Sequence, residues 1–350
     1  MSKRIVIMAG GTGGHVFPAL AVAQHLRSQG WQVSWLGTEK GMESQVIPAN
    51  NIAIDYMTVQ GLRGKGILAL IKMPVMLVRA GWQARKILQK RQPDVVLGMG
   101  GFVAGPGGLL AKLMGIPLVI HEQNRIPGTT NRLLASIANK VLQAFPDSFA
   151  VNKRAIYTGN PLRMAFATQY VGQASKSPAE LHVLVMGGSL GAQRLNEVLP
   201  EALSLFGHVE VRHQTGAKMQ QQVSQAYVDK AINARVVTFI EDVVEAYHWA
   251  DIVICRAGAM TVSEVAAMGV PAIFVPYPYA IDDHQTANAQ YLVAAGAGVM
   301  IAQQQLTAEL LCAQIKLCVT RLGVMAQAAQ KSAKLDATQL VAEQCMLEAA

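Results

Sequence analysis

The chain has 350 residues, of which 51% are hydrophobic and 15% charged, so its length favours two domains and its composition excludes a largely disordered protein. Its formal net charge is +8, and residues 56–93, which hold eight basic residues and no acidic one, account for all of it. The basic residues of this window are Arg63, Lys65, Lys72, Arg79, Arg85, Lys86, Lys90 and Arg91.

Cysteine usage and the lengths of the apolar runs predict a reduced, cytoplasmic protein. The four cysteines lie far apart or in predicted helices, with no CxxC pair and no histidine spacing typical of zinc. The apolar run in MSKRIVIMAGG reaches glycine too soon for a signal peptide. We also expect no membrane-spanning helix, because no uncharged apolar run reaches about 18 residues.

The first half of the chain alternates segments rich in β-branched residues with helical segments. The expected strands are residues 5–10, 31–37, 94–101, 117–123 and 140–145. Strands that are separated by helices pair in parallel through right-handed crossovers.

The second half begins again in the same way. Residues 182–203, HVLVMGGSLGAQRLNEVLPEAL, repeat the order of strand, glycine turn and helix that opens the chain. Further strands are expected at residues 209–216, 235–241, 251–259 and 271–277. The pattern predicts an α/β protein of two doubly wound, Rossmann-like domains that face each other across a cleft.

The two domains are expected to join near GNPLRM, where Pro161 interrupts the chain. We predict a first domain over residues 1–162 and a second over 163–336, with a C-terminal helix, 337–350, that packs back on the first. Ligands of doubly wound sheets lie outside the carboxyl ends of the strands, which here means the cleft.

Glycine-rich turns follow the first strand of each domain, in AGGTGGH and in GGSLGA. Their N–H groups and the positive end of the next helix could bind a diphosphate, or the glycines could simply permit tight packing. The dinucleotide fingerprint fails because Val16 stands where its third glycine belongs, and no P-loop motif occurs. His15 could take a proton from a substrate hydroxyl; the alternative is a helix cap or a packed ring.

Residues 250–276, ADIVICRAGAMTVSEVAAMGVPAIFVP, predict a buried strand, a loop, a short helix and another buried strand. Glu264 could accept both hydroxyls of a ribose, or it could form a purely structural capping box with Thr261. Gln285 and Asn288 are expected just before a helix, as ligands of sugar hydroxyls or as caps.

A polar cluster follows one predicted strand of the first domain. It consists of His121, Glu122, Gln123 and Asn124. Four polar residues at the carboxyl end of a strand are an unusual way to build a core, so the cluster predicts a site.

Six motifs, in this order and at these distances, resemble the MurG family: GGTGGH, GMGGFVAGP, HEQN, GNPLR, GGSLGA and RAGAMTVSE. Members of this family move N-acetylglucosamine from UDP-N-acetylglucosamine onto lipid I, undecaprenyl-pyrophosphoryl-N-acetylmuramoyl-pentapeptide, to make lipid II for peptidoglycan. The resemblance covers nearly the whole chain and implies the GT-B glycosyltransferase fold. It also implies an acceptor- and membrane-facing first domain and a second domain that binds the UDP-sugar.

The resemblance assigns site residues by position. In the first domain it implies donor contacts by Thr12, Gly13 and Gly14, with Asn124 and Arg163 nearby and His15 at the reacting centre as base or diphosphate contact. In the second it implies Ser189 at the diphosphate, the Ile240 backbone at uracil, Glu264 on the ribose and Gln285 at the sugar. The residues around the nucleotide would be Ala259, Met260, Thr261, Val262, Ser263 and Glu264. The chain departs from the family pattern at Arg125, at His284 and in a YPYAIDDHQTANA segment that is one residue longer.

The implied reaction is an inverting displacement, in which the 4-hydroxyl of the acceptor sugar attacks the anomeric carbon as UDP leaves. Loop N–H groups and a helix end would stabilise the charge that develops on the diphosphate. The chain has no D-x-D motif, so we expect no obligatory metal, and we expect no cofactor.

The basic window combines Lys and Arg with Ile, Leu, Met and Trp, which favours a peripheral position on an anionic membrane surface, the cytoplasmic face of the inner membrane. An ordinary helix with a solvated basic face is the alternative. A nucleic-acid partner is not expected, because no aromatic stacking platform or known binding motif accompanies the charge. Two other functions remain open: a GT-B transferase with another acceptor, and a non-catalytic protein that binds UDP-sugar.

Overall fold

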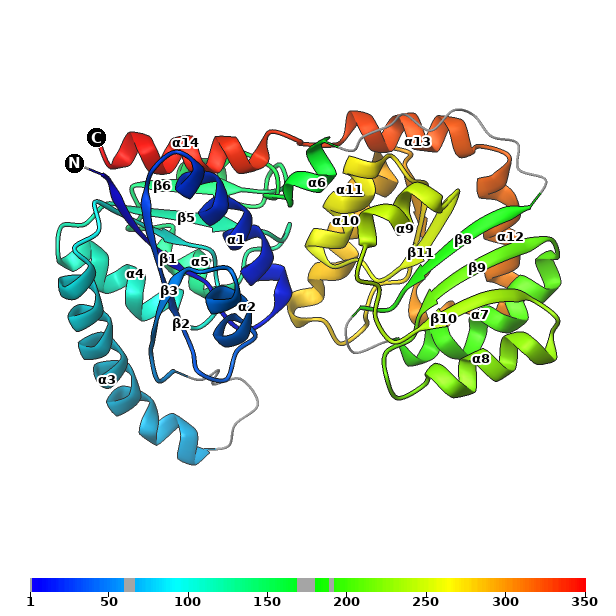
Figure 1. Cartoon of the computed structure of the whole chain (residues 1–350), viewed down its shortest axis with the longest axis horizontal. Helices are drawn as coiled ribbons and strands as arrows, with labels where there is room; N and C mark the ends of the chain where they lie inside the picture. The colour runs from blue at the N-terminus through cyan, green and yellow to red at the C-terminus, as the bar shows by residue number, and fades with distance from the viewer. Residues whose placement is uncertain (1, 60–66, 169–179, 189–191) are drawn as a thin grey trace. The chain divides into compact units, whose positions relative to one another are not determined.

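The computed structural model describes residues 2–59, 67–168, 180–188 and 192–350 (Figure 1). The chain divides into two compact units. Unit 1 comprises Met1–Arg163 and Leu335–Ala350, and unit 2 comprises Met164–Lys334. The C-terminal segment of the chain therefore belongs to unit 1 and not to unit 2, which precedes it in the sequence.

Within the described residues, unit 1 is built on a seven-stranded parallel sheet in the order β3-β2-β1-β4-β5-β6-β7. The strands are β1 (Arg4–Met8), β2 (Gln32–Gly37), β3 (Ala53–Tyr56), β4 (Val95–Gly98), β5 (Leu118–Glu122), β6 (Lys140–Gln143) and β7 (Ile156–Tyr157). The order reverses where β1 pairs with β4, and doubly wound folds bind their ligands at such a point.

Helices cover both faces of this sheet. They are α1 (Gly13–Ser28), α2 (Glu43–Ala49), α3 (Ile67–Arg91), α4 (Ala104–Leu113), α5 (Thr129–Leu134) and α14 (Ala337–Glu348). Alternate residues of β1 point to opposite faces: Ile5 shares a core cluster with residues of α1 and α14, whereas Val6 shares one with residues of α3 and α4. Helix α14 lies along α1, and the Thr338 hydroxyl donates to the Leu162 carbonyl at 3.1 Å (Figure 1).

Unit 2 repeats the arrangement with a described six-stranded parallel sheet in the order β10-β9-β8-β11-β12-β13. The strands are β8 (Leu181–Met186), β9 (Val209–Gln214), β10 (Asn233–Val237), β11 (Ile252–Cys255), β12 (Ala272–Phe274) and β13 (Gly298–Met300). The order reverses where β8 pairs with β11, which again marks the point where a ligand is expected.

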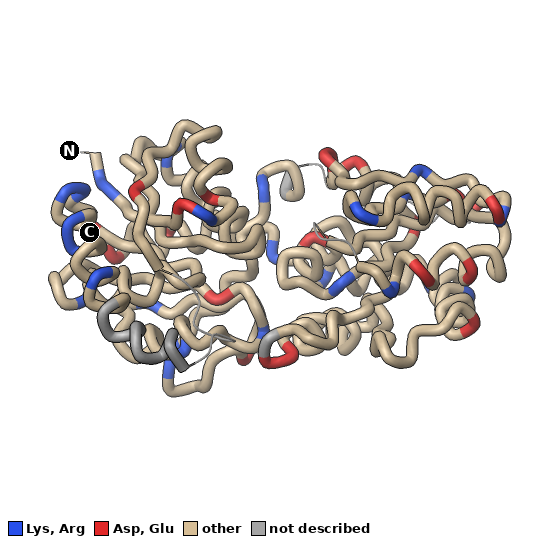
Figure 2. Tube along the Cα trace, turned by 90° about the horizontal axis from the view of Figure 1, so that it is seen from below, with Lys and Arg blue, Asp and Glu red and all other residues tan. Residues whose placement is uncertain are grey.

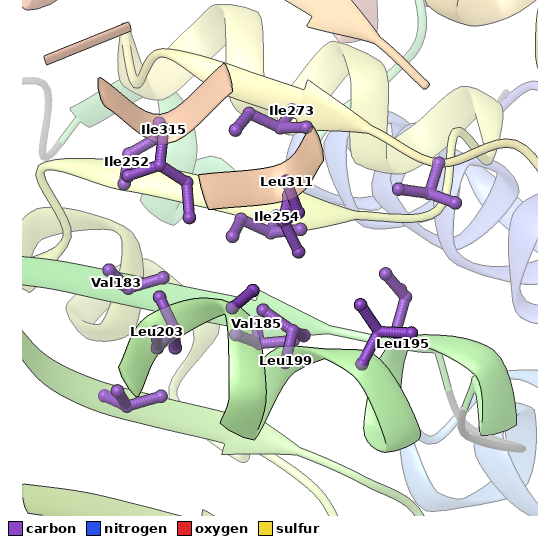
Figure 3. Packing of buried hydrophobic residues seen from close by; sticks show 14 of the residues in the cluster. Val183, Val185, Leu195, Leu199, Leu203, Ile252, Ile254, Ile273, Leu311 and Ile315 are labelled. Atoms are coloured by element: carbon purple, nitrogen blue, oxygen red, sulfur yellow. The ribbon is translucent and has the colours of Figure 1, made fainter. Parts of the chain in front are cut away.

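The helices of unit 2 pack on this sheet. They are α6 (Met164–Thr168), α7 (Gln193–Phe206), α8 (Gln220–Asp229), α9 (Val243–Trp249), α10 (Ala259–Met268), α11 (His284–Ala294), α12 (Ala308–Val319) and α13 (Leu322–Lys331). Figure 3 shows one face of the core, where Val185 of β8 lies beside Leu199 of α7 and Ile254 of β11 lies beside Leu311 of α12. All four side chains are fully buried.

The prediction of two doubly wound α/β units is confirmed, and so is the position of most strands. Strands β3, β7 and β13 were not predicted; all three lie at sheet edges. The four cysteines are buried and make no disulfide. Of the helices in the described part of the chain, none is both long enough and apolar enough to span a membrane.

Candidate active site

The β1–α1 loop lies at the carboxyl end of β1, at the reversal point of the unit 1 sheet. Gly11 has φ +96°, a backbone conformation that residues other than glycine rarely adopt. Thr12 is the N-cap of α1, and its side chain makes no capping hydrogen bond. Gly13 and Gly14 open the helix, so their backbone N–H groups have no partner within α1 and belong to its positive end.

His15 is the third residue of α1, so the expectation of a helix cap is wrong: its N–H donates to the Thr12 carbonyl at 3.1 Å, and Thr12 is the cap. Its half-buried ring packs on the β4–α4 loop. A Cβ built on Gly100 would stand 2.8 Å from Cδ2 and 3.0 Å from Nε2 of His15. Gly100 is therefore needed for space, and its φ of +94° also favours glycine.

The polar cluster at the end of β5 is buried and largely bonded to itself. His121 Nε2 donates to the Gly159 carbonyl at 2.9 Å, and its Nδ1 accepts from Gln123 Nε2 at 3.0 Å. Burial lowers the pKa of His121 to about 4, so the ring is neutral at pH 7 and these two bonds fix its tautomer. Asn160 Nδ2 donates to the Gln123 carbonyl at 3.1 Å, so a hydrogen bond joins the GNPLR segment to the HEQN segment.

Glu122 closes the loop between β5 and α5. Its carboxylate accepts hydrogen bonds from Asn124 N at 2.9 Å, Gly128 N at 3.0 Å and Asn131 Nδ2 at 2.9 Å. Asn124 is held at this strand end, while Arg163 is exposed at the boundary of unit 1. The Glu122 carboxylate thus holds this loop in place, and the expectation that the cluster forms a site stays a prediction.

The sequence predicts no separate role for Gln123, but the environment of its amide oxygen is unusual. Gln123 is 1% exposed, and Oε1 is a buried atom with no hydrogen-bond partner among the described residues. The same Cβ built on Gly100 would stand 3.6 Å from this oxygen. The HEQN cluster therefore reaches the loop on which the His15 ring packs.

In unit 2, helix α10 starts at the carboxyl end of β11, next to β8. Gly258 is its N-cap, so Thr261 lies inside the helix and the expected capping box with Glu264 is wrong. Ala259 and Val262 are buried, whereas Met260, Thr261, Ser263 and Glu264 are partly exposed. Glu264 Oε2 lies 3.5 Å from the Tyr247 hydroxyl of α9, which places the carboxylate between two helices.

Gln285 and Asn288 lie in the first turns of α11, after its N-cap Asp283, so neither caps the helix as expected. Gln285 Oε1 accepts from Ala257 N at 3.3 Å and from Tyr277 N at 2.9 Å. Asn288 Nδ2 donates to the Ala257 carbonyl at 3.2 Å. Both side chains thereby fix the β11–α10 loop from the neighbouring helix.

Another assigned residue lies in a different loop of unit 2. Ile240 is half-buried in the loop between β10 and α9, and α9 packs on α10. Ser189 lies outside the described residues. The described side chains include no group of three or more His, Cys, Asp or Glu that could hold a metal ion.

Comparison with known proteins extends over both units. Residues 5–143 match the glycosyltransferase family 28 N-terminal domain, and residues 182–344 match the glycosyltransferase family 28 C-terminal domain. The chain is 55% identical, over 100% of its length and 99% of the relative, to the UDP-N-acetylglucosamine–N-acetylmuramyl-(pentapeptide) pyrophosphoryl-undecaprenol N-acetylglucosamine transferase of Methylococcus capsulatus. It is 50% identical, over 99% of the chain and 98% of the relative, to the protein of the same name from Pseudoalteromonas translucida.

The chain is also similar to a solved structure, that of Acinetobacter baumannii MurG. The sequence identity is 40%, the TM-score is 0.85, and the match covers 99% of each chain. This likeness extends to the two-domain GT-B fold that the sequence predicts. The chain belongs to glycosyltransferase family 28 and, within it, to the MurG group.

Proposed function

We propose that the protein transfers N-acetylglucosamine from UDP-N-acetylglucosamine to the N-acetylmuramoyl group of lipid I and so makes lipid II for peptidoglycan. The observation that carries this proposal is the 55% identity, over the full length of both chains, with a relative whose name states this transfer. The geometry supports it, because both units present a loop and a helix N-terminus at the reversal point of a doubly wound sheet.

We assign the donor nucleotide to unit 2. Glu264 accepts the ribose hydroxyls, the Ile240 backbone contacts uracil, and the first turns of α10 and Ser189 lie at the diphosphate. Gln285 uses its amide oxygen to hold the β11–α10 loop, so its Nε2 is the atom that remains for a sugar hydroxyl. The positive end of α10 stabilises the charge that develops on UDP as it leaves.

We assign the acceptor and the proton transfer to unit 1. His15, seated on Gly100, removes the proton from the acceptor's 4-hydroxyl or contacts the diphosphate, and the N–H groups of Thr12, Gly13 and Gly14 approach the reacting groups. Asn124 and Arg163 complete this side. Direct attack on an α-linked donor gives a β-linked product.

We assign membrane contact to α3 and its neighbour α4. Val78 and Trp82 of α3 are 75% and 58% exposed, and Leu113 of α4 is 72% exposed. Lys86 Nζ lies 3.7 Å from the centroid of the Trp82 ring. Exposed apolar groups beside basic ones suit the surface of an anionic leaflet, so we place the protein peripherally on the cytoplasmic face of the inner membrane.

The decisive experiment measures UDP release from UDP-N-acetylglucosamine by the purified protein, with and without a lipid I analogue, in EDTA. We expect release that depends on the acceptor and survives the chelator. Donor binding without release would indicate another acceptor or a non-catalytic UDP-sugar-binding protein. Absence of donor binding would refute the proposal.

A further inference from the structure

A buried carboxylate lies beneath the β1–α1 loop. Glu43, the first residue of α2, has no solvent exposure. Its Oε2 accepts from Gly11 N at 3.0 Å, and its Oε1 accepts from the Thr38 backbone N–H and the Thr38 hydroxyl, each at 2.8 Å. The side chain therefore joins the loop after β1 to the loop after β2.

Three glycines make room for this carboxylate. A Cβ built on Gly10, Gly37 or Gly41 would stand 2.5 Å, 2.7 Å or 2.1 Å from an atom of the Glu43 side chain. Real Cβ atoms essentially never come so close, so these glycines and Glu43 form one packed unit. Part of the glycine-rich composition of AGGTGGH thus serves the carboxylate below the loop.

The chemistry of the contact calls for an acid. Among the described residues, no Lys or Arg forms an ion pair with Glu43, so donors from the two loops satisfy the buried charge. An ionised carboxylate accepts at both oxygens, whereas an amide of the same shape accepts at one and donates at the other. Glutamine here would turn an N–H group toward either the Gly11 N–H or the Thr38 N–H.

The loop is also fixed from the side of β4. A Cβ built on Gly101 would stand 2.5 Å from the Gly10 carbonyl oxygen, so the β4–α4 loop lies directly against the β1–α1 loop. The neighbouring Gly100 seats the His15 ring. Anchoring Gly11 therefore fixes the chain four residues before His15, at the point where α1 begins.

We propose that Glu43 is a positioning residue: by holding Gly11, its carboxylate sets the start of helix α1 and the place of His15 for sugar transfer. The proposal rests on the assignment of this loop and His15 to the reacting centre. Displacing a catalytic group by about 1 Å can cost about 100-fold in rate. Loss of the anchor should thus lower kcat and leave the donor site of unit 2 unchanged.

The test compares Glu43→Gln with two controls. Asp94→Asn changes a carboxylate that accepts the Arg4 N–H at 2.7 Å, at the opposite end of β1. Thr38→Val removes one donor to Oε1 and keeps the bond from Gly11 to Oε2. Each variant is measured for kcat, the KM for UDP-N-acetylglucosamine, melting temperature and hydrogen exchange of the backbone amides of residues 10–16.

We expect Glu43→Gln to lower kcat by about tenfold or more, with the KM for the donor within about twofold of wild type and faster exchange in residues 10–16. Both controls should keep kcat within about threefold of wild type. A Glu43→Gln enzyme with the kcat and loop exchange of Asp94→Asn would overturn the proposal.

The two proposals fail in different ways. If wild type transfers no sugar, the proposed function fails, and the exchange data alone then decide whether Glu43 holds the loop. If Glu43→Gln does not fold, Glu43→Asp takes its place. Its carboxylate is charged but one methylene short of Gly11, so unchanged kcat and loop exchange in this variant would refute the positioning role.

Discussion

The Glu264 carboxylate is the strongest single candidate for recognition of the donor. It lies in the second turn of α10 and is partly exposed, and it does not take part in a capping box. A hydrogen bond to a charged group contributes about 1.5–3 kcal/mol, so we expect Glu264→Ala to lower kcat/KM for UDP-N-acetylglucosamine by about 10- to 100-fold. Steady-state kinetics with varied donor measure this effect.

The matched control is Glu245→Ala in the same unit. Glu245 is a carboxylate on α9 that forms a surface ion pair with Arg212 at 2.7 Å. Exposed ion pairs contribute little, so this variant should keep its kcat/KM. Full activity of Glu264→Ala would refute the ribose assignment.

Gly100 leaves the room in which the His15 ring packs. Substituting it, alongside a second glycine of positive φ, distinguishes the steric effect on His15 from the cost of backbone strain. In Gly100→Ala the new Cβ would stand 2.8 Å from the His15 ring, at a φ of +94°. Gly115→Ala adds the same methyl group at a φ of +74°, with nothing within 4 Å of it. Both variants should lose about 1 kcal/mol or more of stability from the backbone.

Only Gly100→Ala should also lower kcat, by about tenfold or more, because the imidazole must move. Denaturant unfolding gives the stability, and turnover with a lipid I analogue gives kcat. Equal kcat in the two alanine variants would mean that the position of His15 is unimportant for transfer.

At the scale of elements, the strands that could be predicted are mostly the interior ones. An interior strand of a parallel sheet is covered on both faces and forms a continuous apolar run, as in IVIM of β1 and VVLG of β4. The edge strands β3 and β7 are only partly buried, and β13 has three residues, so their sequences carry little of that signal. The starts of α10 and α11 differ from the prediction because Gly258 and Asp283 are their N-caps, not the residues that the sequence suggested.

Buried histidines in both sheets make stability depend on pH. Burial lowers the pKa of His121 at the end of β5 to about 4 and that of His213 in β9 to about 3. Because each folded value lies below the ordinary 6.5, the unfolded chain binds the extra proton as the pH falls below about 6.5. The contribution of these histidines to the free energy of unfolding is therefore fully present above about pH 6.5. It decreases as the pH falls, and at pH 5 the loss is about 2 kcal/mol per histidine.

Urea unfolding at pH 7.5 and pH 5.0 tests this expectation. His121→Gln and His213→Gln should each reduce the loss of stability between the two pH values. His208→Gln is the control, because His208 is exposed in the turn between α7 and β9 and lies outside both networks. An unchanged pH dependence in both buried-site variants would contradict the assignment.

At the level of the whole molecule, the place of the candidate site could be predicted from the sequence, because the carboxyl ends of parallel strands lie at the same edge of a sheet. This rule places AGGTGGH, GMGG and HEQN on one edge of unit 1, as observed. It does not reveal Glu43, whose partners Gly11 and Thr38 lie 32 and 5 residues away in the chain. Only the folded arrangement of β1, β2 and α2 brings these groups together.

The net charge of the whole chain is concentrated in one window, and this has a consequence for binding. Basic and acidic residues both occur in each unit (Figure 2), yet residues 56–93 carry the full excess of +8. Each basic residue near an anionic surface contributes about 1 kcal/mol, and the contribution falls within a Debye length as salt rises. We therefore expect binding to vesicles with anionic lipid to weaken in high salt.

A single acidic substitution can test whether α3 is the contact surface. Val78 of α3 and Val228 of α8 are 75% and 67% exposed, so aspartate at either position leaves the core intact. One added negative charge should cost about 1 kcal/mol, so Val78→Asp should bind vesicles with anionic lipid about fivefold more weakly. Val228→Asp makes the same change of charge in unit 2 and should bind as wild type does. Equal binding by both variants in a vesicle sedimentation assay would mean that another surface meets the membrane.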